Sequence, residues 1–104
     1  MEKIPKALTI AGSDSGAGAG IQADLKTFSA LGVHGSSVIT AITAQNTKEV
    51  TAVHNVPLDI IEKQIDAVLS DIGADAAKIG MLSNSEIIRT ISKKLKSYNI
   101  KNIV

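Results

Sequence analysis

The stretch ALTIAGSDSGAGAGIQADLKTFSALG, residues 7–32, contains the clearest structural pattern of this sequence. A compact apolar run over residues 6–11 predicts a buried strand. A loop that is rich in glycine follows this run. Apolar residues at helical spacing then predict a helix over residues 21–31, which ends at Gly32. The stretch therefore predicts a strand, a glycine loop and a helix in succession.

The rest of the 104 residues continues this alternation of strand and helix patterns. Strands are predicted at residues 36–44, 50–56 and 76–81, and helices at residues 57–72 and 83–98. The second strand has the clearer alternation of an edge strand. Ser83 and Glu86 form a capping-box pattern at the start of the last helix. The alternation indicates an α/β fold with a mostly parallel sheet. The closing run NIV has the pattern of a strand without its continuation, so we expect residues 1–104 to be the N-terminal segment of a larger domain.

Composition excludes several classes of function. The formal net charge is +1 with both signs interspersed, so we expect neither a nucleic-acid partner nor an anionic membrane partner. The lysine cluster at residues 93–96 is typical of a solvated helix face. Without cysteine, and with His34 and His54 far from other ligand types, no metal site is predicted. No signal peptide and no long apolar span occur, so a cytoplasmic protein is expected.

Three mechanisms could explain the glycines of the loop, residues 12–20. A phosphate-binding P-loop requires a lysine directly after its last glycine, and none follows here before Lys26. Gly18, Gly20 and Ala23 match a dinucleotide fingerprint, but the acidic residue expected about 20 positions later is missing from the segment ITAQNT. The third mechanism is close approach of the main chain to a small substrate, which would accept hydrogen bonds from N–H groups at the start of the helix.

Polar side chains near this loop are candidates for substrate contact. Asp14 lies in the loop and Asp24 lies one turn into the helix, where each could equally serve as a cap or a surface residue. Gln45 ends a buried strand, and the carboxyl ends of parallel strands share one rim of a sheet. Its amide can donate and accept together, which suits a heterocycle with an amino group beside a ring nitrogen, although a turn-forming role would also explain it. Met81 could supply an apolar wall or simply pack in the core.

The segment AGSDSGAGAGIQADLKTFSALG, together with AITAQNT and KIGML, resembles the opening of the hydroxymethylpyrimidine/phosphomethylpyrimidine kinases of thiamine biosynthesis. This resemblance extends through IKNIV and so covers essentially the whole chain. It implies the N-terminal part of a ribokinase-like three-layer α/β/α sandwich. It also implies phosphoryl transfer from ATP, with Mg²⁺, to an aminopyrimidine alcohol and then to its monophosphate, by an enzyme that is usually a homodimer.

The resemblance also assigns roles to residues at matching positions. Gln45 would read the pyrimidine edge and Asp24 would line the pocket as a polar group. Ala19 and Gly20 would bring bare main chain close to the ring, and Met81 would form an apolar wall. No catalytic base and no metal ligand is assigned within these residues. In this family the base, the anion hole and most of the ATP site lie in a later part of the chain, so the 104 residues alone are expected to be inactive.

Two further readings remain open. A pyridoxal or pyridoxine kinase of the same lineage can share the glycine loop, although AQNT favours the aminopyrimidine enzyme. A truncated remnant that binds without turnover belongs to a different functional class. One departure from the family concerns Ala17, which stands where consecutive glycines are common. Its methyl group is expected to require a negative φ.

Overall fold

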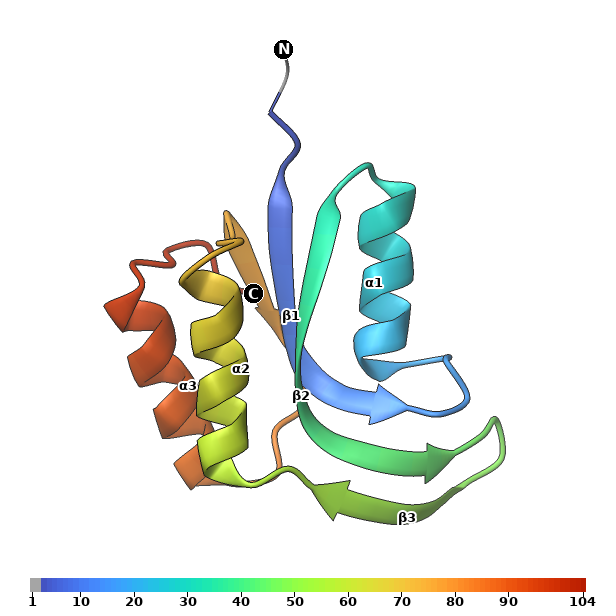
Figure 1. Ribbon diagram of the computed structural model, residues 1–104. Helices are drawn as coiled ribbons and strands as arrows, with labels where there is room; N and C mark the ends of the chain where they lie inside the picture. Colours follow the sequence, from blue (N-terminus) through green and yellow to red (C-terminus); the bar gives the residue numbers. More distant parts are fainter. Residues whose placement is uncertain (1–2) are drawn as a thin grey trace.

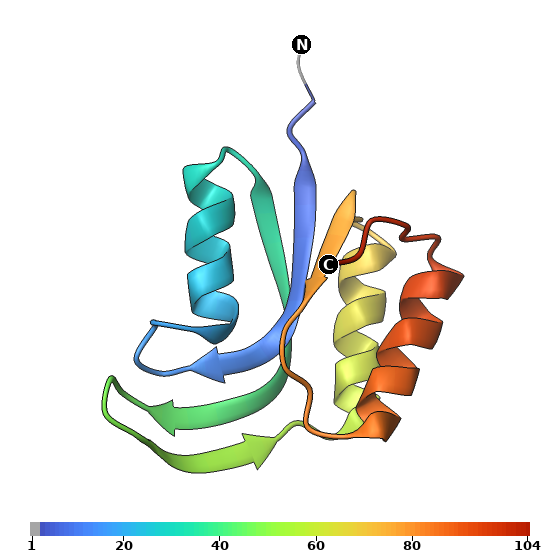
Figure 2. The same ribbon diagram turned by 180° about the vertical axis from the view of Figure 1, so that it is seen from behind.

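The computed structural model, which describes residues 3–104, has three layers: a four-stranded sheet and helices on both of its faces (Figure 1). The elements are β1 (Lys6–Asp14), α1 (Gly20–Ala30), β2 (His34–Gln45), β3 (Val50–Asn55), α2 (Leu58–Leu69), β4 (Ala76–Ile79) and α3 (Ser85–Ser97). Figures 1 and 2 show α1 on one face of the sheet and the pair α2 and α3 on the other. This arrangement confirms the predicted three-layer α/β/α fold.

The sheet has the strand order β3-β2-β1-β4, with β1 parallel to both of its neighbours. β3 runs antiparallel to β2, at the edge of the sheet. The mostly parallel sheet and the edge position of the short strand were both predicted from sequence. The final residues pair with β4 through one isolated parallel bridge between Ala77 and Ile103, so the predicted last strand is a single bridge among the described residues.

The main core lies between the sheet and the helices α2 and α3. Alternate residues of the central strands point to this face, because successive side chains of a strand project to opposite sides. The helices meet them with apolar stripes at helical spacing. The fully buried members of this core are Leu8, Ile10, Val38, Ile61, Ile65, Ile91 and Leu95. Each such side chain stabilises the fold by roughly 1.5–3 kcal/mol relative to an exposed position.

The helix ends differ in detail from the sequence prediction. Helix α2 ends at Leu69, so Ile72 lies beyond the helix and not on its buried stripe. Helix α3 is capped by Asn84, whose side-chain oxygen accepts a hydrogen bond of 2.9 Å from the Ile87 N–H. The predicted capping box at Ser83 is therefore wrong, because asparagine is an equally good N-cap and lies one residue later. Among residues 3–104, no helix has the length and apolar character needed to cross a bilayer.

Candidate functional site

The glycine loop and the end of β2 lie side by side at one rim of the sheet. β1 and β2 are parallel, so their carboxyl ends meet there. Both strands are irregular at this rim: the pairing shifts by one residue between Ala11 and Ser13, and again between Ala44 and Gln45. Such bulges bend strands and redirect side chains, and they are common next to functional sites.

The carboxylate of Asp14 organises the loop. Its Oδ1 accepts a hydrogen bond from the N–H of Gly16 at 2.7 Å. Its Oδ2 accepts from the N–H groups of Gly18 at 2.9 Å and Ala19 at 2.8 Å, and its backbone carbonyl accepts from the Ala17 N–H at 3.0 Å. Every N–H group from residue 16 to residue 19 is thus bonded within the protein. These four N–H groups are therefore not available to a substrate, and donation from the N–H groups at the start of the helix, from Gly20 onward, stays a prediction.

Two positive φ angles give the loop its shape. Ala17 has φ of 64°, so the expectation of a negative value is wrong. The turn closed by the Ala17 N–H holds this conformation, and Lys26 Nζ donates to the Ala17 carbonyl at 3.0 Å. A left-handed alanine costs about 1–2 kcal/mol. Gly20 has φ of 61°, and a Cβ there would collide with the carbonyl oxygen of Gly12 on β1. Glycine is therefore required at position 20 by the fold itself.

A cavity of about 400 Å³ lies where the loop, the end of β2 and the turn after β4 meet. Of the five residues assigned to the pocket from sequence, four line this cavity: Ala19, Gly20, Gln45 and Met81. Met81 forms an outer wall and is 95% exposed. The loop and the Gln45 side chain thus converge on one space large enough for a single ring compound. Which of the four contacts a substrate stays a prediction.

Gln45 is fixed to the loop through its main chain. Its N–H donates to the Ser15 hydroxyl at 2.7 Å, and the same hydroxyl donates to the Gln45 carbonyl at 2.6 Å. These bonds leave the side-chain amide available, and its Oε1 atom lies 3.1 Å from Thr43 Oγ1. The loop and the amide are therefore held in one fixed relation to each other.

Asp24 lies beneath the cavity and is not one of the residues that line it. Its Oδ2 accepts a 2.6 Å hydrogen bond from Thr9 and forms a 3.0 Å ion pair with Lys78 Nζ. Asp24 therefore does not line the cavity in this structure, and its contact with a substrate stays a prediction. Lys78 itself lines the cavity, and sequence reasoning missed it. The signal was available, because a lysine inside the short apolar strand AAKI needs a partner on the face that α1 covers.

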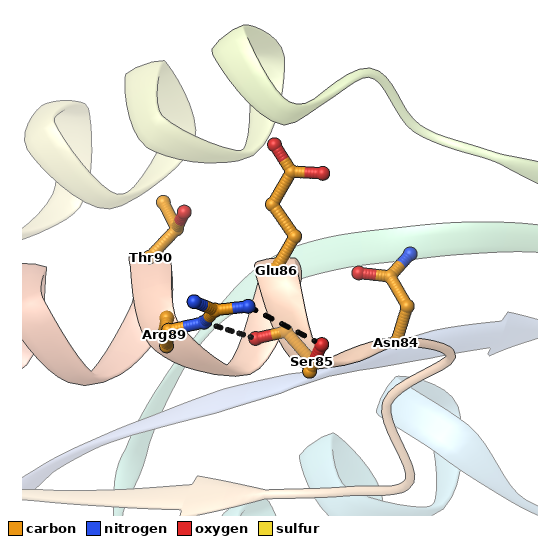
Figure 3. A pocket seen from close by; sticks show the side chains of 5 residues that line it. All are labelled: Asn84, Ser85, Glu86, Arg89 and Thr90. Carbon is orange, nitrogen blue, oxygen red and sulfur yellow. Dashed lines mark hydrogen bonds between the residues drawn. The ribbon is translucent and has the colours of Figure 1, made fainter.

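A second hollow, of about 570 Å³, opens at the start of α3 and is shown in Figure 3. Arg89 contacts the carbonyl and hydroxyl oxygens of Ser85 there, at a long 3.5 Å in both cases. Glu86 projects from the same turn toward the other side of the hollow (Figure 3). None of the five residues assigned to the substrate pocket from sequence lines this hollow, and weakly held surface side chains form its walls.

An ion pair joins α2 to α3, away from the cavity. Both carboxylate oxygens of Asp66 accept from Lys94 at 2.9 Å, and Tyr98 donates to Oδ1 at 2.7 Å. The hydrogen bond from Lys94, and after it that from Tyr98, holds the pKa of Asp66 below its ordinary value. The Asp66 carboxylate raises the pKa of Lys94 and that of Tyr98. Lys93 and Lys96 are exposed, as expected for a solvated face, whereas Lys94 is half-buried in this ion pair.

Comparison with known proteins identifies similar kinases. The family model for phosphomethylpyrimidine kinase matches residues 14–104. A hydroxymethylpyrimidine/phosphomethylpyrimidine kinase of Rhizobium meliloti is 61% identical over 94% of this chain. The crystal structure of a phosphomethylpyrimidine kinase from Clostridium difficile superposes with a TM-score of 0.92 at 63% identity, over 97% of this chain and 43% of that chain. A pyridoxal kinase of Staphylococcus aureus, in complex with AMP-PCP and pyridoxal, gives 0.87 at 43% identity over 98% of this chain and 38% of that chain.

These observations define the class: an α/β kinase fold with a glycine loop at the rim where the carboxyl ends of its parallel strands meet. The chain belongs to the phosphomethylpyrimidine kinase family. It spans 37% of the length of the Rhizobium meliloti relative.

Proposed function

We propose that this chain provides the substrate-binding part of an ATP-dependent kinase for 4-amino-5-hydroxymethyl-2-methylpyrimidine and its monophosphate. In this proposal residues 1–104 form the N-terminal segment of one kinase domain, which acts in the cytoplasm as a homodimer. The enzyme transfers the γ-phosphoryl group of ATP to the hydroxymethyl oxygen, a base accepts the hydroxyl proton, and ADP is released. A second transfer to the monophosphate completes the activation of the pyrimidine.

The observation that supports the proposal most is the convergence of Gln45 and the glycine loop on one cavity. A neutral aromatic ring with adjacent donor and acceptor groups can bond to an amide and lie close to main chain that carries little side chain. The two charged groups of the lining are already bonded within the protein, Lys78 to Asp24 and Asp14 to the loop N–H groups. The family relationship supports the same substrate class.

The residues described here do not fit the phosphate groups of ATP or Mg²⁺. The loop has no P-loop lysine, and Asp14 already occupies its N–H groups. Among residues 3–104 no group of three or more His, Asp or Glu side chains could hold a metal ion. Asp24 is bonded to Thr9 and Lys78. In the proposed enzyme ATP and Mg²⁺ therefore bind elsewhere, and this segment contributes only acceptor recognition.

The test is a kinase assay on the complete gene product with the aminopyrimidine alcohol and its monophosphate. Gln45→Ala is expected to raise KM for the pyrimidine about tenfold and to leave KM for ATP unchanged, since the removed amide contacts only the acceptor. Lys48→Ala, in the exposed turn after β2, is the matched control. An unchanged KM for the pyrimidine in Gln45→Ala would contradict the assigned role.

Pyridoxal is the second candidate acceptor, supported by the similarity to the Staphylococcus aureus pyridoxal kinase. It is less favoured because the identity to that enzyme is 43%, against 63% for the Clostridium difficile kinase. The same assay with pyridoxal decides between the two substrates. Absence of turnover on all three compounds would favour the third reading, a remnant that binds without catalysis.

A further inference from the structure

The hydroxyl group of Thr43 lies between the main chain of β1 and the side chain of Gln45. Its oxygen is 2.8 Å from the Ser13 carbonyl oxygen and 3.1 Å from an atom of the Gln45 amide. A carbonyl oxygen can only accept, so the single hydroxyl proton of Thr43 is directed to Ser13. The hydroxyl therefore has only lone pairs left for Gln45.

This requirement decides which end of the Gln45 amide faces Thr43. In the structure Oε1 occupies the position 3.1 Å from the hydroxyl, which places two acceptors against each other once the proton is directed to Ser13. A half-turn of the amide exchanges its oxygen and nitrogen without changing its shape. The amide nitrogen then donates to the Thr43 hydroxyl, and the hydroxyl donates to the Ser13 carbonyl, so each contact joins a donor to an acceptor.

We propose that Thr43 is a positioning residue, which fixes the Gln45 amide with Nε2 toward its own hydroxyl and Oε1 toward the substrate cavity. The chain of donors runs from the Gln45 amide to Thr43 and from Thr43 to the carbonyl of Ser13. The cavity then presents an acceptor at this wall, while the second N–H of the amide remains beside it. An amino group of a substrate can donate to Oε1 while the adjacent ring nitrogen accepts from the amide N–H. An oxo group next to a ring N–H would instead place an acceptor against Oε1 and a donor against the amide N–H.

This inference rests on the proposed function, because it names the group by which the enzyme would select its pyrimidine. The position is suited to that role. Thr43 is partly buried and lies two residues before Gln45, so both side chains lie on the same face of β2. A buried acceptor left facing an oxo group weakens binding more than a missing contact does, so the orientation of one amide can discriminate strongly between the two ring types.

The kinetic test compares the wild-type complete gene product with Thr43→Val and Thr43→Ser, using the 4-aminopyrimidine alcohol and its 4-oxo analogue. Thr43→Val is expected to raise KM for the amino substrate about five- to tenfold with kcat nearly unchanged, and to lower the preference for it over the oxo analogue by a similar factor. Thr43→Ser keeps the hydroxyl and is expected to keep the preference. An unaltered preference in folded Thr43→Val, or an equal loss in Thr43→Ser, would overturn the proposal.

A second measurement does not depend on activity or on any variant. Nuclear Overhauser contacts between the side-chain amide protons of Gln45 and the Thr43 side chain are expected in the unliganded wild-type protein. Their absence, with both amide protons directed into the cavity, would overturn the assigned orientation. If the contacts are present but neither pyrimidine is phosphorylated, the orientation holds and the proposed substrate is wrong.

Discussion

Replacing Asp14 by alanine tests the central feature of the site, a loop held by one carboxylate. The side chain is 5% exposed and accepts from three main-chain N–H groups at 2.7 to 2.9 Å. Asp14→Ala removes all three bonds. A hydrogen bond to a charged group contributes about 1.5–3 kcal/mol, but the donor residues Gly16, Gly18 and Ala19 are exposed, so water replaces part of each bond. We therefore expect about 1 kcal/mol for each bond and a total loss near 3 kcal/mol.

Asp14→Asn refines this test. Its remaining oxygen can serve either Gly16 or the pair Gly18 and Ala19, while its amino group faces the other donors. We expect the oxygen to serve the pair, with a loss of about 1–2 kcal/mol. Asp71→Ala is the control, because Asp71 is an exposed aspartate after α2 and its loss should change stability by about 0.5 kcal/mol or less.

The assay is urea denaturation of the complete gene product, with the free energy of unfolding taken from transitions of equal slope. The expected order of stability is wild type and Asp71→Ala together, then Asp14→Asn, then Asp14→Ala. A loss below about 1 kcal/mol in Asp14→Ala would show that the carboxylate does not hold the loop. Equal stability of Asp14→Asn and wild type would refute the reasoning on the two oxygens.

Three further predictions concern the backbone and the helix pair. Gly20→Ala is expected to destabilise the fold by about 3 kcal/mol or more, because the new methyl group combines a left-handed backbone with a collision against β1, and a thermal midpoint equal to wild type would contradict this. Ala17→Gly should raise the free energy of unfolding by about 0.5–1 kcal/mol in urea, and no gain would show that Ala17 is unstrained. Lys94 and Tyr98 lower the pKa of Asp66 in the folded protein. The ionised Asp66 should therefore stabilise the fold at pH values above its ordinary pKa of 3.8, and this contribution should be lost as the pH falls through the lower folded-state pKa. Asp66→Asn should therefore flatten the acid side of a stability profile from about pH 2 to 6, and an unchanged profile would exclude this contribution.

Most of the fold could be predicted from sequence because its strands and helices have unambiguous periods. The apolar run after Pro5 and the β-branched run before Gln45 are recognisable as buried parallel strands. The strand ends are less predictable: β1 continues to Asp14, three residues past the predicted end. The extension follows a register shift between Ala11 and Ser13 in the pairing with β2, a strand more than 20 residues later in the chain, and a local pattern does not show such a shift.

The site could be predicted in outline but not in its hydrogen bonding. The shared rim of the loop and Gln45 follows from the topology of a parallel sheet. The bonding partners of the Asp14 carboxylate could not be predicted from spacing, because a capping role and a ligand-binding role both predict an aspartate at this position. The same limit applies to Asp24, whose partner Lys78 is 54 residues away in the chain. Long-range pairs of this kind leave no periodic signal in one sequence.

The internal bonding of the loop has a consequence for binding affinity. A flexible glycine segment would lose conformational freedom when a ligand ordered it, at about 1–2 kcal/mol for each residue fixed. Here the segment is already ordered before any ligand arrives, since Asp14 and Ser15 tether it to its own backbone and to β2. A small flat molecule can then enter a preorganised surface, and nearly all of its contact energy is available for affinity.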